Sequence, residues 1–297
     1  MAEGSIINLG DISKPAAILV ERVCDAVGGI AKPWQMKRVA RAEVAVEQIR
    51  ALGAIELTEI QERGLARLIE DAEQKQRNIE SITAKAIPHL RSDADPAAID
   101  RDWLASMFDR AQLYSSEEAQ ELWGRILGEE ANKPGTFSRR SLEVINSLDA
   151  SDARAFEKLC SAMWDWGKPM LVIVDPNKSG VPGLTFDDIL TLESIGLIST
   201  GLGYSLSGIQ AKKGLVRYHG VSVYIEFPHT ENNQVPTGAV LFTKLGAQLA
   251  GIVSAEPILQ VFEAAMKMWI DEGCWVAINI DSPGLPWVKD QAASVCR

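Results

Sequence analysis

Apolar residues recur at helical spacing in the first part of the chain, after a serine that can cap a helix. Ser13 is that candidate cap, and Pro15 falls in the first turn, where its missing N–H costs nothing. Gly28-Gly29 and Pro33 end the pattern. The sequence therefore predicts one short amphipathic helix, whose apolar stripe is Ile18, Leu19, Val23, Ala26, Val27 and Ile30.

A basic cluster follows this helix directly, with no acidic residue between Lys32 and Arg41. An apolar helix beside a basic cluster is typical of proteins that lie on an anionic membrane surface. Glu21 and Asp25 on the polar face weaken attraction to lipid, so the alternative is that the stripe packs on the protein's own core or on a sister subunit. The candidate membrane or partner contacts are Ile18, Leu19, Val23, Val27, Ile30, Lys32, Lys37, Arg38 and Arg41.

From Gln35 to His89 the chain has the composition of a helix and no proline before Pro88. Fifty residues of continuous helix would reach about 75 Å, which is longer than a domain is wide. Either this segment bends at Gly53 and Gly64 into a hairpin, or it projects as an arm and pairs with other copies. We expect oligomerisation through the arm, and a hairpin within one chain is the alternative.

A compact helical block is predicted from about Ala97 to Trp166. Ser115 and Glu118 have the spacing of a capping box, and Ser138 can cap the next helix. Ser151-Asp152 is expected to cap a further helix, which would continue as far as Met163 and Trp164.

Two cations, Arg139 and Arg140, fall in the first turn of the helix that Ser138 caps, where they oppose its dipole. We expect them to pair with Glu129 and Glu130. The alternative is that they receive a phosphate or a partner's carboxylate, since arginine forks suit both groups.

The C-terminal half alternates between strands and helices. The sequence predicts a glycine-rich turn at Gly201–Gly203 and a hairpin around His219-Gly220. Helices are expected from Thr185 to about Gly196, after Thr243 and from Pro257 onward. The predicted strands are Pro169–Val174, the two arms of Leu215–Phe227, Gly238–Phe242 and Cys274–Ile280.

Helix, strand, helix and hairpin together resemble a winged helix, which makes DNA binding a hypothesis. The helix before the hairpin carries Asp187, Asp188 and Glu193 and no basic residue, which does not suit phosphate contact. Lys212, Lys213 and Arg217 could form a small basic patch. We therefore predict that this module serves packing or protein contact, and that nucleic acid is not its main partner.

The predicted fold class is α+β and mainly α, with a long N-terminal helical arm, a compact helical block and a C-terminal winged-helix-like mixed module. The expected divisions are an amphipathic segment over residues 1–34, the arm or hairpin over 35–93, the helical domain over 97–166 and the mixed module over 167–297.

Composition narrows the function classes. Of the 297 residues, 46% are apolar and 24% are charged, as in a globular protein, and the net charge of −10 argues against whole-surface binding to nucleic acid or anionic lipid. No apolar run reaches the length of a membrane span, and the first residues have no basic region or cleavage site, so we expect no secretory signal. The four cysteines are far apart in sequence, which suits free thiols in a reducing cytosol.

The sequence contains no phosphate-binding loop, nucleophile elbow or zinc-protease motif, and its three histidines lack zinc-type spacing. Cys160 falls on an apolar helix, where a core position is the usual role. We predict no catalytic residue, no metal site and no cofactor.

Three stretches resemble one family of bacterial proteins, domain-of-unknown-function family 2806. They are Asn8–Gln35, the QRNIESITAKA segment at Gln76–Ala86, and Asp109–Cys160 with its Leu-Trp-x-x-Ile-Leu, Pro-Gly-x-x-Ser-Arg and Asp-Ala-x-x-Phe elements. The resemblance implies no established activity. A similar helical block occurs in abortive-infection-type proteins, and this association is the basis for a phage-defence hypothesis.

Three functions are compatible with these patterns. The first is a non-enzymatic, cytoplasmic interaction protein that forms homo-oligomers, binds a protein partner and contacts a membrane surface through its first helix as a phage-defence sensor or effector. The second is a DNA-binding regulator, and the third is a hydrolase or nuclease whose acidic groups converge only in the fold.

Overall fold

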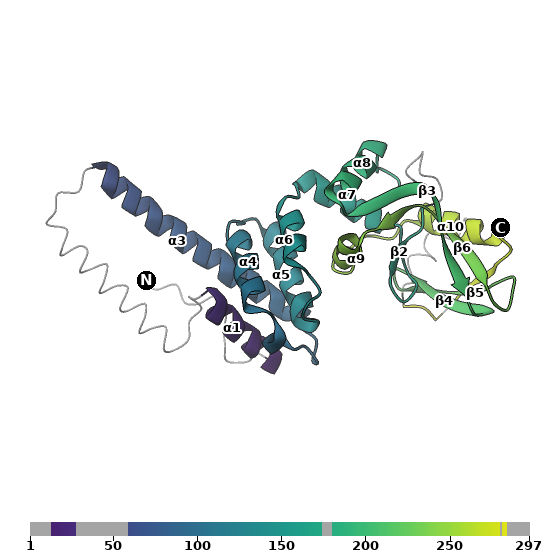
Figure 1. The fold of residues 1–297 in the computed structure, drawn as a ribbon, viewed down its shortest axis with the longest axis horizontal. Helices are drawn as coiled ribbons and strands as arrows, with labels where there is room; N and C mark the ends of the chain where they lie inside the picture. The colour runs from purple at the N-terminus through teal and green to yellow at the C-terminus, as the bar shows by residue number, and fades with distance from the viewer. Residues whose placement is uncertain (1–12, 28–58, 174–179, 280, 284–297) are drawn as a thin grey trace. The chain divides into compact units, whose positions relative to one another are not determined.

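The computed structural model describes residues 13–27, 59–173, 180–279 and 281–283, shown as the coloured ribbon in Figure 1. The chain forms two compact units, unit 1 and unit 2, and the boundary between them in the sequence lies between Asn146 and Ser147. This boundary comes earlier than the one expected near residue 166, so one helix of the predicted helical block belongs to the second unit.

Unit 1 is helical. Helix α1 (Lys14–Val27) lies alongside α4 (Arg101–Ala111), and α3 (Glu59–Ala86) packs on α5 (Glu117–Asn132), as Figure 1 shows. The short helices η1 (Ile87–His89) and η2 (Pro96–Ala98) connect these elements, and α6 (Arg139–Asn146) packs on α4. The core between the helices is rich in aromatic side chains, with Trp103, Phe108, Trp123 and Phe137 each at most 4% exposed.

Helices α1, α5 and α6 of unit 1 each begin at a serine whose hydroxyl accepts a hydrogen bond from a backbone N–H in the first turn. The Ser13 hydroxyl accepts a hydrogen bond from the Ala16 N–H, and the Ser138 hydroxyl accepts one from the Ser141 N–H. The cap of α5 is Ser116, which accepts from the Ala119 N–H, so the prediction of Ser115 was wrong by one residue. Helix α3 continues through Gly64, so the bend of the hairpin alternative does not occur at this glycine, and Gly53 lies outside the described residues.

Unit 2 contains two antiparallel sheets. Strands β1 (Met163–Asp165), β2 (Pro169–Leu171), β4 (Lys213–Tyr218), β5 (Val221–Glu226) and β7 (Trp275–Ile278) form one sheet in the order β2-β1-β4-β5-β7. Strands β3 (Ile198–Ile209) and β6 (Asn233–Phe242) form the other. The helices of this unit are α7 (Ala150–Cys160), α8 (Phe186–Ile195), α9 (Lys244–Ala250) and α10 (Leu259–Asp271).

The predicted hairpin is the centre of the five-stranded sheet. Its two-residue turn has positive φ at both His219 (43°) and Gly220 (83°), which is the turn type that matches the twist of paired strands. Beside it, the buried ring of Trp164 lies 4.8 Å from Tyr218, 5.5 Å from Phe262 and 4.7 Å from Trp269. This aromatic cluster joins β1, β4 and α10 into one core.

Three predictions in unit 2 were wrong. Met163 and Trp164 lie in strand β1, because helix α7 ends at Cys160, and the cap of α7 is Asp149 with Asp152 in a capping box. The segment Gly201–Gly203 lies within strand β3, where its pairing with β6 is irregular. Helix α8 has the expected caps, Thr185 and Gly196. The predicted fold class, a mainly helical α+β protein, is confirmed.

Candidate interaction site on helix α3

Helix α3 has two halves with different surroundings. From Gln76 onward its side chains enter the core of unit 1, where Ile79, Ile82 and Ala86 are at most 6% exposed. From Glu59 to Lys75 every side chain that the structure describes is exposed. One half therefore fixes the helix in unit 1, and the other half extends about 26 Å away from that contact.

Two glycines let α3 approach α5 closely. A Cβ atom at Gly124 would lie 2.7 Å from the Lys85 Cβ and 3.1 Å from the Lys85 carbonyl carbon. A Cβ atom at Gly128 would lie 2.8 Å from the His89 Cβ and 3.2 Å from the Ala86 carbonyl oxygen. Both spacings are shorter than ordinary contacts, so the face of α5 that meets α3 has to be free of side chains at these two positions.

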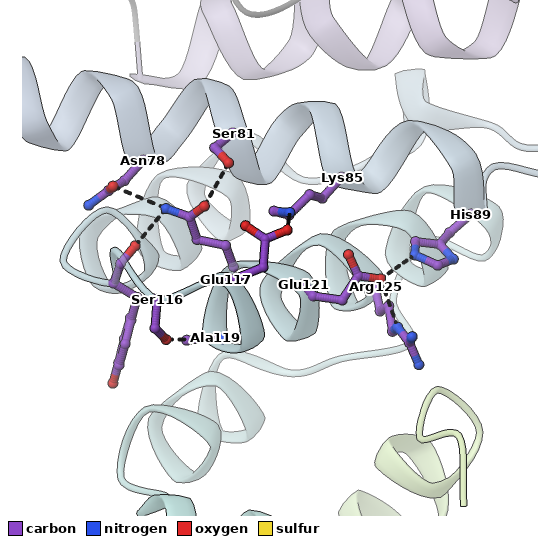
Figure 2. Close-up of polar contacts among 11 residues, drawn as sticks. Asn78, Ser81, Lys85, His89, Ser116, Glu117, Ala119, Glu121 and Arg125 are labelled. Atoms are coloured by element: carbon purple, nitrogen blue, oxygen red, sulfur yellow. Dashed lines mark hydrogen bonds and ion pairs between the residues drawn. The ribbon is translucent and has the colours of Figure 1, made fainter.

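A buried amide network sets the register of α3 in the bundle. Asn78, which is 2% exposed, donates to the Gln112 carbonyl at 2.7 Å, and its side-chain oxygen accepts from the Gln120 amide at 3.1 Å. The Gln120 oxygen accepts from the Ser81 hydroxyl at 2.6 Å (Figure 2). Because each buried amide needs its partners, sliding α3 by one turn would leave several polar groups unpaired.

Ion pairs continue the same seam toward the end of α3 (Figure 2). Lys85 pairs with Glu117, and Glu121 lies 3.1 Å from the His89 ring and 3.0 Å from Arg125. Burial raises the pKa of the Glu121 carboxyl, but hydrogen bonds from Arg125 and His89 outweigh it and hold that pKa below its ordinary value. The polar residues of this segment thus form a continuous seam with α5 and the turn before it, made by Gln74, Asn78, Ser81, Lys85 and His89.

The apolar face that α3 buries in unit 1 continues along its exposed half. Ala72 precedes Ile79 by seven residues and Leu68 precedes it by eleven, so all three lie on one side of the helix. Leu68 is 66% exposed and Ile60 is 75% exposed. The arm therefore presents an apolar stripe with no described residue packed over it.

The stripe predicted on the first helix is mostly buried inside unit 1. Leu19 and Val23 are fully buried, and Ile18 and Val27 are partly buried. The helix packs on α4 and η2, and the Arg101 side chain donates to the Asp25 carbonyl at 3.2 Å. This arrangement is the core alternative of the sequence analysis, and it leaves no open apolar stripe on α1 for a lipid surface.

The remaining candidate contacts after this helix are Ile30, Lys32, Lys37, Arg38 and Arg41. They lie outside the described residues, so their role stays a prediction.

Arg139 and Arg140 have different environments from the ones expected. Arg139 lies 3.4 Å from Asp100 and 3.3 Å from Asp102, across the start of α4, instead of pairing with Glu129 or Glu130. Arg140 is exposed and forms no ion pair with any residue that the structure describes. The expected pairing was therefore wrong in its partners, because neither glutamate is available to Arg139.

Glu130 instead organises the loop that precedes α6. It is 2% exposed, and its carboxylate accepts hydrogen bonds from the N–H groups of Gly135 at 2.6 Å and Phe137 at 2.8 Å. Burial raises the pKa of Glu130 above its ordinary value, against the lowering effect of these backbone donors. The Pro-Gly-x-x-Ser-Arg element is thus a loop folded around a buried carboxylate.

The structure gives no chemical role to the groups considered as nucleophiles or metal ligands. Cys160 is fully buried, and burial raises its pKa, so its thiol is a core group as expected. Among the described residues, no three His, Cys, Asp or Glu side chains are placed to hold a metal ion. In the same part of the chain no helix has the length and apolar character needed to cross a membrane.

Sequence reasoning missed the residues that join α3 to α5. The four-residue spacing of Gly124 and Gly128 was a usable signal, because small residues at i and i+4 lie on one helix face. Asn78 and Gln120 gave no such signal, since nothing in a linear pattern marks two amides forty-two residues apart as partners. The three-dimensional contact was needed to identify the seam.

A family model matches more than half of the chain. No curated protein and no solved structure matches the chain. The match covers residues 62–266, from the exposed half of α3 to within α10, and includes the polar seam, the Glu130 loop and every strand of unit 2 except β7. The chain therefore belongs to the family described as protein of unknown function DUF2806.

Proposed function

We propose that this protein is an interaction protein that self-associates through the exposed half of helix α3. The observation that supports the proposal is the apolar face of α3, which is buried at Ile79 and remains open at Leu68 and Ala72. A second copy of the same helix, packed alongside, would cover this stripe in the way that α4 and α5 cover its continuation.

Helix energetics favour a partner for this segment. Most helix stability in proteins comes from packing an amphipathic face, and the exposed half of α3, about seventeen residues long, has no such packing against the described residues. The exposed ion pairs Glu59–Arg63 and Glu73–Arg77 add only about 0.2–0.5 kcal/mol each. Both charge signs occur along the arm, with five acidic and three basic residues from Glu59 to Lys75, so two copies need an alignment that sets opposite charges side by side to offset the net negative charge of each arm.

The other sequence-based functions stay predictions. Membrane contact by α1 would require that helix to leave α4, since its stripe is buried there. The phage-defence association rests on resemblance alone, and the DNA-binding and hydrolase hypotheses gain no supporting contact from the described residues.

A matched pair of substitutions tests the proposal. Ala72→Glu places a charge on the open stripe, whereas Ala66→Glu makes the same change on the opposite side of the same exposed helix. Sedimentation velocity and light scattering on the full chain measure the mass over a range of protein concentrations. The chain mass is 32.4 kDa, which sets the monomer value.

We expect the wild-type mass to exceed that of one chain, to fall in Ala72→Glu and to remain unchanged in Ala66→Glu. Circular dichroism should show the same helix content in the two variants, because both sites are exposed. A wild-type protein that stays monomeric at every concentration would refute the proposal and favour a hairpin within one chain. Equal effects of the two substitutions would also refute it.

A further inference from the structure

The outer face of the five-stranded sheet carries an exposed apolar patch. Leu215 on β4 pairs in register with Tyr224 on β5, which pairs with Ala277 on β7, so the three lie in one row on the same face. Trp275 lies two residues from Ala277 on β7 and shares that face. Leu215, Tyr224 and Trp275 are 47, 48 and 62% exposed.

Charged groups of both signs border this patch. Lys213 lies 3.6 Å from Glu226 at one end, and Arg217 lies 3.5 Å from Asp165 at the other. By strand register these four side chains share the face of Tyr224. An aromatic centre with a polar border is typical of protein–protein interfaces, where Tyr and Trp are enriched.

The charge balance of the border selects the class of partner. The chain as a whole has a net charge of −10, whereas the charges at this patch nearly balance: Lys213 pairs with Glu226 and Arg217 with Asp165, and Lys212 also lies 3.9 Å from Glu226. A polyanion such as DNA or an anionic membrane would meet a nearly neutral surface on an acidic protein, which does not favour binding. Two acidic copies of this chain can approach each other at such a surface with little repulsion.

We propose that the face of the sheet formed by Leu215, Tyr224 and Trp275 is a second self-association surface, on which another copy of this chain packs face to face. A two-fold axis running along β5 sets Tyr224 of one copy against Tyr224 of the other. It also brings the two Glu226 carboxylates toward each other, and Lys212 and Lys213 of each copy lie beside them to offset their charge. The same axis lays β4 of each copy over β7 of its neighbour. Leu215 then meets Ala277, and the Trp275 ring lies over the Lys213 ammonium, as in a cation–π contact.

This surface is independent of the α3 arm, because the two lie in different units of the chain. One arm surface and one sheet surface on each copy would allow assemblies larger than a dimer. A single set of variants therefore tests both surfaces separately.

The first experiment compares the mass of four full-length proteins by sedimentation velocity: wild type, Ala72→Glu, Tyr224→Glu and the double variant. We expect each single variant to form dimers, the wild type to form larger species and the double variant to be monomeric. Ala72→Glu protein that is monomeric throughout would overturn the sheet surface and leave the arm proposal intact. Tyr224→Glu protein with the wild-type mass would also overturn it, whereas monomeric Tyr224→Glu protein would refute only the arm.

The second experiment tests the two-fold geometry. Tyr224→Cys in a Cys296→Ser background should cross-link to a second copy with a short bismaleimide, because the three cysteines that the structure describes are buried. Leu202→Cys is the control, since Leu202 is fully exposed on β3 in the other sheet. Cross-linked dimer from Tyr224→Cys and not from Leu202→Cys supports the proposal. Equal yields from the two variants, or none from either, would overturn it.

Discussion

Adding one methyl group at Gly124 should separate packing from helix propensity, because the same change can be made at Gly64. Both glycines lie inside helices, and replacing either with alanine improves helix propensity by about 1 kcal/mol. Nothing lies within 4 Å of a Cβ atom at Gly64, whereas a Cβ atom at Gly124 meets Lys85 at 2.7 Å. The propensity gain is common to both variants, so their difference reports the α3–α5 contact.

The magnitude follows from which atoms obstruct the methyl group. At Gly124 the close atoms include the Lys85 carbonyl carbon at 3.1 Å and the Ala86 nitrogen at 3.2 Å, so the α3 backbone has to move. Overpacking of this kind costs about 1–3 kcal/mol. After the propensity gain, Gly124→Ala should lower the stability of unit 1 by up to about 2 kcal/mol, and the melting temperature should fall by roughly 2–4 °C for each kcal/mol.

Thermal and urea unfolding followed by circular dichroism at the helix band measures this change. Gly64→Ala should keep or raise both the melting temperature and the helix signal. Gly128→Ala should behave like Gly124→Ala, because its Cβ atom would lie 2.8 Å from His89. If Gly124→Ala gained as much stability as Gly64→Ala, the two helices would not be in the close contact described here.

Three further outcomes concern buried groups. Leu19→Ala should destabilise unit 1 by about 2–5 kcal/mol in urea unfolding, because its side chain is fully buried; a change below about 1 kcal/mol would mean that α1 is not part of the core. Burial raises the pKa of Glu130, so this group stabilises the fold fully at pH values below its unfolded pKa, and the contribution is lost as pH rises through its folded pKa. Over that pH range the Glu130→Gln variant should gain stability relative to wild type in urea unfolding. Parallel pH profiles of the two proteins would contradict this prediction. Burial lowers the pKa of His219, so this group stabilises the fold fully at pH values above its unfolded pKa, and the contribution is lost as pH falls through its folded pKa. Asparagine tolerates the positive φ at this position, so urea unfolding of His219→Asn should show no such loss of stability at acid pH.

Local chemistry explains which elements the sequence could predict. Helix α8 was predicted with both caps because Thr185 and Gly196 act within one turn of the helix ends. The hairpin β4–β5 was predicted because His219-Gly220 separates two runs with strand alternation. Each of these signals depends on neighbouring residues and needs no contact from a distant part of the chain.

The errors have the opposite origin. Met163 and Trp164 fit the apolar stripe of a helix, but the Trp164 ring stacks with Phe262, almost a hundred residues later, and the backbone pairs with β2. Arg139 was assigned to glutamates close in sequence, whereas its acidic partners Asp100 and Asp102 come from α4. In both cases a long-range contact outweighed the local pattern.

The arm illustrates the same limit and gives it a functional meaning. The sequence could predict a helix with an apolar stripe, yet it could not tell where along the stripe the chain supplies its own partner. The structure locates that point near Gln76: Ile79 is buried in unit 1, and Leu68, eleven residues earlier on the same side, is exposed. Leu68 and Ala72 lie on the side of α3 that is buried at Ile79, so the apolar packing that holds the second half of the helix in unit 1 is of the same kind as the packing that we propose a partner provides for the first half.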